Sequence, residues 1–396
     1  MPPTSAEPTC DDVESLLSED RIGPRDGAGK LCVVAMSGGV DSAVTALVMR
    51  ERGYRVVGIN LRLFSPDDED HRANPCCGIP AMDDARRTCA RIGVPFYALN
   101  MEAEFGEAVI ERFVDEYANG RTPNPCLECN RGVKFRHLVE RARALGADCL
   151  ATGHYARIAH GDPAAGEPHR LLRALDPLKD QSYVLHTLGQ EHLAYLRFPL
   201  GGLRKPETRA LARAFGLPVA DKPESQEICF VGNRSYADFV AARRPEAVRP
   251  GEVVTAGGEV IGAHRGFAHH TVGQRRGLGI AAKEPYYVLR LEPVANRVVV
   301  GTREQAAAAA LAAVGVAFTN GMWPSGPVSC EAMVRYRGKA APATVSPGPA
   351  GSGAATVRFY GAGAGPVASP GQAVVFYRGD EVLGGGTIAA VETAAG

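Results

Sequence analysis

The sequence predicts an α/β domain built on a parallel sheet, followed by two smaller β-rich modules. Short apolar runs alternate with amphipathic stretches from Leu31 to about residue 154, which is typical of strands alternating with helices. After about residue 220, Gly-rich and β-branched segments replace the helical periods. In a chain of 396 residues we therefore expect a disordered tail over 1–29, the α/β domain over 30–222, a central β-rich domain over 223–298 and a C-terminal antiparallel β-barrel over 299–396.

The elements of the α/β region follow one another in a regular order. The run LCVVAM is typical of a buried strand, and Val44, Leu47 and Val48 mark one face of the helix that follows it. Further strands are expected at YRVVGINL, PFYALNM and DCLATGH, and further helices over 81–92, 102–118 and 132–145. Strands that alternate with helices in this way form parallel sheets with right-handed crossovers.

The β-rich part of the chain is less regular. The segments GEVVTAGGEVIGAHRG and PYYVLRLEPVANRVVVG indicate the central module, and VSCEAMVRYRG, AATVRFYG and QAVVFYRGDEVLGGGTI indicate the barrel. An Ala-rich segment over 306–313 suits either a helix or a linker, and the composition does not choose between them.

Charge and composition exclude several classes of protein. Lys plus Arg total 44 and Asp plus Glu total 44, so any nucleic-acid-binding surface has to be local. The first 29 residues lack the apolar core of a secretory signal, and no stretch reaches the roughly 18–20 apolar residues that span a bilayer. We expect a cytoplasmic protein without membrane contact, whose ten cysteines stay reduced unless they serve catalysis or bind metal.

The sequence VVAMSGGVDSAV places a glycine-rich loop between a predicted strand and a predicted helix. Glycines let the backbone approach an anion, and the helix N-terminus directs free N–H groups at it. The lysine and spacing of a Walker A loop are absent, so ordinary γ-phosphate transfer is not indicated. A capped Gly-Gly turn without function is the alternative, but the whole hexapeptide Ser37–Ser42 lies at the correct junction for a phosphate site.

A second motif, RTPNPCLECNRGVKF, sets Cys126 and Cys129 three positions apart behind a stiff Asn-Pro step. Such a pair can bind zinc, form a redox couple or handle sulfur; the Pro-rich context argues against a thioredoxin-like couple. Cys76 and Cys77 stay unassigned. We expect no reaction at the five cysteines of the tail, the predicted strands and a helix face, namely Cys10, Cys32, Cys89, Cys149 and Cys330.

The loop SGGVDS resembles the pyrophosphate loop of ATP-pyrophosphatases, which adenylate an oxygen atom and release pyrophosphate. The segments GRTPNPCLECNRGVKF, LGADCLATGHYARI, LLRALDPLKDQSYVLHTL, ESQEICFVG, HHTVGQRRGLGI, VRYRGKAAPATV and PGQAVVFYRGDEVLGGGTI follow it in order. Together they are similar to the bacterial tRNA-specific 2-thiouridylases, from about residue 31 to the C-terminus. The resemblance implies that ATP, with Mg²⁺, adenylates O2 of the wobble uridine of tRNA and that sulfur from a protein thiol then displaces AMP.

The resemblance also implies roles for individual residues. It makes Cys129 the nucleophile and Cys229 the persulfide carrier. The implied sulfur source is a sulfur-donor protein, or sulfide where an iron–sulfur cluster takes the place of the persulfide. The implied ATP contacts are Ala35, Met36, Ser37, Gly38, Gly39, Val40, Asp41, Ser42, Leu61 and Gly153. The implied tRNA contacts are Asn124, Pro125, Cys126, His154, Lys179, Asp180, Gln181, Tyr336, Arg337 and Gln372.

This chain departs from the family pattern at two positions. Leu61 stands where Met is frequent, an apolar exchange, and Cys126 stands where many members have an Asp proposed to assist proton transfer. A third thiol favours a four-iron four-sulfur cluster held by Cys126, Cys129 and Cys229 as an alternative to the persulfide route, with structural zinc as a further alternative. The competing functions are an amidotransferase-like ATP-pyrophosphatase ligase and a non-catalytic, zinc-containing RNA-binding protein.

Overall fold

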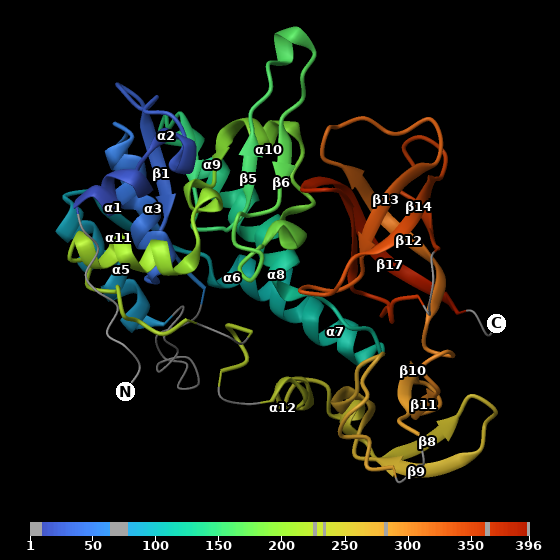
Figure 1. Cartoon of the computed structure of the whole chain (residues 1–396). Helices are drawn as coiled ribbons and strands as arrows, with labels where there is room; N and C mark the ends of the chain where they lie inside the picture. Colours follow the sequence, from blue (N-terminus) through green and yellow to red (C-terminus); the bar gives the residue numbers. More distant parts are fainter. Residues whose placement is uncertain are drawn as a thin grey trace. The chain divides into compact units, whose positions relative to one another are not determined.

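The computed structural model describes residues 10–63, 78–224, 228–232, 235–280, 284–360 and 365–393 (Figure 1). The chain divides into two compact units. The first comprises residues 1–108 and 129–232, and the second comprises residues 109–128 and 233–396. Each unit is described separately below.

A five-stranded parallel sheet forms the centre of the first unit, in the order β3-β2-β1-β4-β7. Its strands are β1 (Leu31–Ala35), β2 (Arg55–Arg62), β3 (Phe96–Asn100), β4 (Cys149–Ala151) and β7 (Leu196–Arg197). The central strand β1 is apolar because it is buried among its neighbours, as the LCVVAM run predicts. The predicted parallel α/β fold is confirmed.

Helices pack against this sheet. Helix α3 (Val40–Glu51) directly follows β1 and packs against α5 (Ile79–Ile92) and α11 (Lys205–Ala214). Leu47, Val48 and Leu211 are fully buried in the shared core. Further described helical elements of this unit, with η marking 3₁₀- and π-helices, are α6 (Glu102–Phe105), η1 (Gly106–Glu111, which runs into the second unit), η2 (Cys129–Leu138), α9 (Val139–Ala144), η3 (Pro163–Ala165), η4 (Ser182–Leu185), α10 (Gln190–Tyr195) and η5 (Pro199–Gly202). Strands β5 (Arg157–Ala159) and β6 (Arg170–Leu172) pair as an antiparallel hairpin.

The predicted tail over 1–29 contains two short helices in the part that the structure describes, so the expectation of disorder does not hold for residues 10–22. Residues Cys10–Leu16 form α1 and Glu19–Ile22 form α2. Leu16 and Ile22 are buried in the core of the first unit. The tail alone has too little apolar surface to fold, but it can fold where the α/β core supplies the partner surface.

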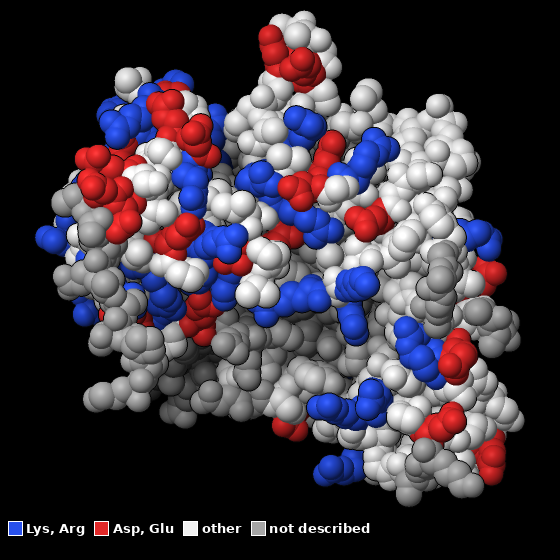
Figure 2. Space-filling view, viewed as in Figure 1, with Lys and Arg blue, Asp and Glu red and all other residues white. Residues whose placement is uncertain are grey.

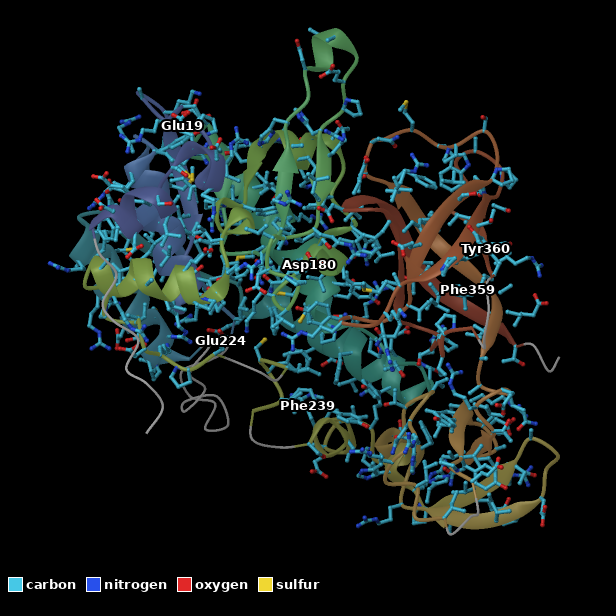
Figure 3. The ribbon with its side chains drawn as sticks, viewed as in Figure 1. Glu19, Asp180, Glu224, Phe239, Phe359 and Tyr360 are labelled. Carbon is cyan, nitrogen blue, oxygen red and sulfur yellow. The ribbon has the colours of Figure 1, made fainter. Side chains whose placement is uncertain are left out.

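A small mixed sheet of order β10-β11-β8-β9 belongs to the second unit. Its strands are β8 (Gly251–Thr255), β9 (Val260–His264), β10 (Tyr287–Glu292) and β11 (Arg297–Gly301). The described helical elements of this unit are α7 (Arg112–Ala118), α8 (Pro125–Glu128), α12 (Tyr236–Ala241), η6 (Pro245–Val248) and η7 (Phe267–His269). Helix α7 is held to α12 by the Phe113–Phe239 ring contact, with centroids 6.4 Å apart; Figure 3 labels Phe239.

A closed six-stranded antiparallel barrel completes the second unit, in the order β12-β15-β14-β13-β16-β17 with β17 paired back to β12. Its strands are β12 (Ala308–Phe318), β13 (Val328–Met333), β14 (Ala341–Pro347), β15 (Ala355–Phe359), β16 (Ala373–Arg378) and β17 (Glu381–Thr393). Closure leaves few edge hydrogen-bonding groups exposed. The predicted C-terminal barrel is confirmed.

The Ala-rich segment 306–313 is neither a helix nor a linker, because from Ala308 it forms β12. Alanine favours helix locally, but β12 has partners on both sides: Leu311 lies opposite Val357 of β15 and Val391 of β17. The small side chains also suit the interior of a narrow barrel. Tertiary pairing has overridden local propensity.

Among the described residues, no helix is both long enough and apolar enough to cross a membrane. On the face drawn in Figure 2, Lys and Arg side chains are interspersed with Asp and Glu, in keeping with the equal totals in the sequence.

Candidate active site

The glycine-rich loop lies between the end of β1 and the start of α3, as predicted. The Ser42 hydroxyl accepts a hydrogen bond from the Ser37 N–H (3.1 Å) and donates to the Gly39 carbonyl (3.0 Å). No side chain caps the N-terminus of α3, whose N-cap residue is Gly39. The first turn of a twelve-residue helix therefore presents its N–H groups and positive dipole end, which suits a phosphate ligand.

Two glycines allow close backbone approach at this loop. Gly38 has φ +75°, and a Cβ there would lie 1.9 Å from the carbonyl oxygen of Ala81. A Cβ at Gly153 would lie 3.0 Å from the Ser42 nitrogen and 3.1 Å from the Asp41 Cβ. Gly153, which follows β4, is thus brought against the loop as the prediction of a shared nucleotide site requires.

We expect Gly38→Ala to abolish ATP binding, because it combines a backbone clash with left-handed strain of about 1–2 kcal/mol. Gly93→Ala is the matched control: Gly93 has φ +70°, but nothing lies within 4 Å of its added Cβ. Titration calorimetry with ATP and thermal unfolding measure the two effects. Equal ATP affinity in both variants would show that the contact with Ala81 is unimportant.

The other predicted nucleotide residues lie on the two central strands or in the loop. Met36 donates its N–H to the Ile59 carbonyl (2.8 Å) and accepts from the Asn60 side chain (2.6 Å). Leu61 is half-buried near the end of β2. Because β1 and β2 are parallel, their carboxyl ends share one edge of the sheet, where open α/β sheets bind ligands.

A network of charged side chains adjoins the loop. The Lys205 ammonium contacts both carboxylate oxygens of Asp41, at 2.7 and 2.8 Å, and lies 3.0 Å from Glu224. Glu224, labelled in Figure 3, also pairs with Lys179. The Tyr155 hydroxyl donates to Asp41 at 2.9 Å. Lys205 at the first turn of α11 thus connects the phosphate loop to Glu224.

The protonation states in this network are set by burial and charge. Burial raises the pKa of Tyr155 well above its ordinary value, and the charge of Asp41 adds to this, so the phenol is a neutral donor. Burial also raises the pKa of Glu224, but hydrogen bonds from Lys179 and Lys205 outweigh it, so the pKa lies below its ordinary value. Glu224 is therefore ionised near neutral pH.

Sequence reasoning missed several of these residues. Lys222 donates to the Gly38 carbonyl at 3.0 Å and to Asp84 at 2.7 Å, and Arg209 lies 3.8 Å from Glu224. Lys205 and Lys222 are more than 150 residues from the loop in sequence, and no spacing rule connects them to it. Tyr155 lies in the segment LGADCLATGHYARI, and Glu224 is the first residue of ESQEICFVG. These two family-like segments could have indicated that both residues belong to the site.

Asp180 and Gln181, which the resemblance assigns to tRNA, have contacts within the first unit. Asp180, labelled in Figure 3, accepts hydrogen bonds from the Ala174 N–H (3.0 Å) and from the Ser182 N–H (3.1 Å) and hydroxyl (2.9 Å). Gln181 accepts from the Tyr155 N–H at 3.0 Å. Both side chains therefore organise the segment that carries Lys179, and their assignment to tRNA stays a prediction.

His154 lies beside two aromatic rings, with its centroid 5.8 Å from Phe135 and 5.9 Å from Phe198. Its Nδ1 is 2.7 Å from the Thr152 hydroxyl. Burial lowers the pKa of His154 to about 3, and the charge of Lys134 acts in the same direction. A neutral imidazole can contribute a hydrogen bond or stacking to a nucleobase, but no positive charge.

The two thiols of the motif NPCLEC differ in exposure. Asn124 caps α8 by accepting a hydrogen bond from the Cys126 N–H at 3.1 Å, and Pro125 is the first residue of that helix. Cys126 is exposed, whereas Cys129, the first residue of η2, is 7% exposed. Asn130, next to Cys129, is buried and donates to the Val184 carbonyl at 3.1 Å.

Cys229 is half-buried, and its neighbour Phe230 is anchored in the first unit. Phe230 packs edge-on against Phe105, with centroids 5.9 Å apart. Phe105 ends α6, which packs against η2, the element that begins with Cys129. Cys129 and Cys229 are a hundred positions apart in sequence, but α6 contacts both η2, which begins with Cys129, and Phe230, the neighbour of Cys229. The predicted sulfur transfer requires the two thiols to lie in neighbouring segments of this kind.

A zinc or iron–sulfur site needs several ligating side chains grouped in one place. Within the described ranges, no three His, Cys, Asp or Glu side chains are grouped so as to hold a metal ion. The iron–sulfur and zinc sites that the sequence suggests for Cys126, Cys129 and Cys229 therefore stay predictions.

Three of the residues assigned to tRNA, Tyr336, Arg337 and Gln372, lie on turns of the barrel. Arg337 has φ +58° and stacks on Tyr336, with the guanidinium 5.3 Å from the ring centroid. Arg337 is exposed, so this pair can meet a phosphate or a base. Gln372 instead donates to the Thr122 carbonyl at 2.9 Å.

Four of the five cysteines expected to be unreactive are buried: Cys32, Cys89, Cys149 and Cys330. Burial raises the pKa of the Cys89 and Cys330 thiols to about 11. Cys76 and Cys77 lie outside the described residues.

Three family profiles match consecutive parts of the chain. Residues 30–233 match the family described as "tRNA methyl transferase HUP domain", residues 237–302 the "tRNA methyl transferase PRC-barrel domain", and residues 309–388 the "Aminomethyltransferase beta-barrel domain". These three matches follow the order of the α/β, central and barrel regions.

Curated relatives match nearly the whole length. The tRNA-specific 2-thiouridylase MnmA of Roseiflexus sp. is 47% identical over 371 residues, covering 90% of this chain and 98% of the relative. The protein of the same name from Geobacter metallireducens is 48% identical over 372 residues, covering 92% and 98%. Among solved structures, the U34-tRNA thiolase NcsA from Methanococcus maripaludis is 17% identical with a TM-score of 0.35, covering 59% of this chain and 67% of that one.

Proposed function

The chain belongs to the family of tRNA-specific 2-thiouridylases, and on that basis we propose how its own residues carry out the reaction. It is an ATP-dependent tRNA sulfurtransferase that converts a uridine of tRNA to 2-thiouridine. We propose that the uridine is the wobble base, that the reaction takes place in the cytoplasm, and that a sulfur-donor protein transfers persulfide sulfur to the Cys229 thiol while its own thiol is released.

The main support for placing adenylation and sulfur delivery at one site is that Glu224 connects the phosphate loop to the segment that contains Cys229. Glu224 contacts Lys205, which contacts Asp41 of the phosphate loop. Cys229 follows Glu224 by five residues, so its Cα lies within about 18 Å of that of Glu224 even for an extended chain. Adenylation and sulfur delivery can therefore use one region of the first unit.

In the first step, O2 of the uridine attacks the α-phosphorus of ATP and pyrophosphate leaves. The loop Ser37–Ser42 and the N-terminus of α3 bind the leaving group, and Lys205 and Lys222 offset its negative charge. Adenylation makes O2, which is a poor leaving group by itself, leave as part of AMP. The step costs one phosphoric anhydride bond and needs no redox partner.

Mg²⁺ would be held by Asp41, since carboxylate and phosphate oxygens are the ligands it prefers. When bound, it supplies further positive charge at the phosphates. Asp41 fits this role because its carboxylate lies at the first turn of α3 beside the phosphate loop, and an ionised carboxylate has about four lone-pair sites, of which Lys205 and Tyr155 occupy three.

In the second step, the terminal sulfur of a Cys229 persulfide attacks C2 of the adenylated uridine and AMP leaves. The thiolate of Cys129 then attacks the Cys229 sulfur, which forms a Cys129–Cys229 disulfide and leaves the electron pair of the broken S–S bond on the sulfur of the base. An external thiol reduces this disulfide before the next turnover. A thiolate or persulfide is a strong nucleophile near neutral pH.

The tRNA contacts follow from the resemblance and from the exposed groups. We propose that Asn124, Pro125 and Cys126 lie near the target base, that neutral His154 contributes hydrogen bonding or stacking, and that Arg337 binds phosphate. Lys179, Asp180, Gln181 and Tyr336 complete the proposed set. Lys179 contacts Glu224, so it would join tRNA binding to the nucleotide site.

The decisive experiment measures 2-thiouridine on a tRNA transcript together with iron and acid-labile sulfide in protein purified without oxygen. We expect ATP-dependent thiolation by iron-free protein that is supplied with a persulfide donor. Activity that follows about four irons per chain and disappears on chelation would instead make Cys126, Cys129 and Cys229 cluster ligands. Pyrophosphate release without thiolation of any tRNA would favour a ligase, and no release would favour an RNA-binding protein.

A further inference from the structure

We propose that Gln372 and Gly371, in the loop before β16, are positioning residues that hold the segment leading into the motif NPCLEC for sulfur transfer. The inference rests on the proposed function. In this proposal the C-terminal barrel supports sulfur transfer by holding Thr122. Thr122 and the barrel both belong to the second unit.

Both backbone hydrogen-bonding groups of Thr122 are taken by the barrel. Its N–H donates to the Pro370 carbonyl at 3.0 Å, and its carbonyl accepts from the Gln372 side-chain amide at 2.9 Å. Thr122 is 7% exposed, so water cannot readily replace either bond. Two hydrogen bonds thus join Thr122 to residues 370 and 372, which lie more than 240 positions away in sequence.

Glycine at position 371 permits this contact. Gly371 has φ +89°, a left-handed conformation that other residues rarely adopt. A Cβ there would lie 3.1 Å from the Arg121 Cβ and from the Thr122 nitrogen. A larger side chain at this position would push Thr122 away from the loop.

The loop itself is fixed on its barrel side. The Gly371 N–H donates to the Ile388 carbonyl (2.9 Å), and the Ile388 N–H donates to the Gln372 carbonyl (2.8 Å). The Ser369 hydroxyl donates to the Val272 carbonyl at 2.8 Å. Strand β17 and the loop that follows η7 therefore hold residues 369–372, and these in turn hold Thr122.

A short, stiff stretch of chain connects Thr122 to Cys126, so the position of Thr122 restricts where Cys126 can lie. Pro123 and Pro125 have fixed φ angles, and Asn124 accepts hydrogen bonds from the Cys126 N–H (3.1 Å) and the Leu127 N–H (3.1 Å). Few free torsions separate Thr122 from Cys126. Displacing Thr122 should therefore displace the start of α8, which continues into Cys129.

This role differs from the tRNA contact that the family resemblance implies for Gln372. The Nε2 atom of Gln372 is already engaged with Thr122. A positioning residue should affect sulfur transfer more than tRNA affinity, whereas a tRNA contact should affect affinity first. Variants at Gly371 disturb the same contact without removing a side chain that could touch tRNA.

The test uses the full chain with Gln372→Ala, Gln372→Glu and Gly371→Ala. Gly379→Ala is the matched control, because Gly379 lies in the β16–β17 turn of the same barrel with φ +58° and nothing lies within 4 Å of an added Cβ. Single-turnover assays measure pyrophosphate released and 2-thiouridine formed per tRNA, filter binding measures tRNA affinity, and thermal unfolding checks the fold.

We expect all three variants to lower the rate of 2-thiouridine formation per adenylated tRNA by about 10–100-fold, the scale of a misplaced reacting group. Pyrophosphate release and tRNA affinity should stay near wild type, and Gly379→Ala should match wild type throughout. Weaker tRNA binding in the Gln372 variants with normal transfer in Gly371→Ala would overturn the proposal in favour of a tRNA contact. Normal transfer in folded Gln372→Glu and Gly371→Ala would overturn it outright. Failure of the proposed function shows itself separately, as absence of thiolation by the wild type.

Discussion

Replacing Cys229 by Ser is expected to lower thiolation by about 10³-fold or more while ATP- and tRNA-dependent pyrophosphate release continues. The reason is that the oxygen of Ser can neither carry a persulfide nor attack as a thiolate does. Cys129→Ser should give the same overall loss but stall later, with sulfur attached to the base through a disulfide to Cys229. Mass spectrometry of the tRNA–protein adduct distinguishes these two stages.

Cys126→Asp is the matched comparison, because it restores the residue frequent at this position in the family. In the persulfide route this variant should keep thiolation within about threefold of wild type, since Cys126 is neither the carrier nor its partner. If Cys126→Asp loses activity together with bound iron, the persulfide route is wrong. If Cys129→Ser retains thiolation, the assignment of that residue is wrong.

Replacing Lys205 by Ala is expected to lower kcat/KM for ATP by about 10²–10³-fold, the usual effect of removing one group that stabilises developing charge. The Lys205 ammonium is the described cation closest to Asp41, at 2.7 and 2.8 Å, and its side chain is only 9% exposed. Its loss removes a positive charge next to the phosphate loop. Steady-state pyrophosphate release at varied ATP concentration measures the effect.

Two further variants separate catalysis from folding. Arg213→Ala removes a surface ion pair with Asp221 (2.7 Å) from the same helix and should leave activity near wild type. Glu224→Gln removes the negative charge opposite Lys205 while keeping the side-chain shape. It therefore tests the ion pair between Lys205 and Glu224 while the Lys205 charge stays in place. A Lys205→Ala protein that is folded and has an unchanged ATP KM and kcat would contradict the proposed role of Lys205 at the phosphates.

The parts of the site that could be predicted are those contained in continuous motifs. The phosphate loop was found because glycine, helix start and strand end occur together within a few residues. The thiols were found because cysteine is chemically distinctive and lies in recognisable segments. Lys205 and Lys222 could not be found in this way, because each is an ordinary lysine until the fold brings it to Asp41 or to Gly38.

Local patterns along the chain were enough to predict the parallel α/β core, the C-terminal barrel and the order of the motifs, because buried strands, amphipathic helices and glycine turns have characteristic periodicities. The strand Ala308–Phe318 and the helices within residues 10–22 became evident only from the folded chain. These segments lack a decisive local preference, so long-range pairing and burial set their conformation. The same holds for Thr122 and Gln372, whose contact depends on distant chain segments meeting and has no signature in either segment alone.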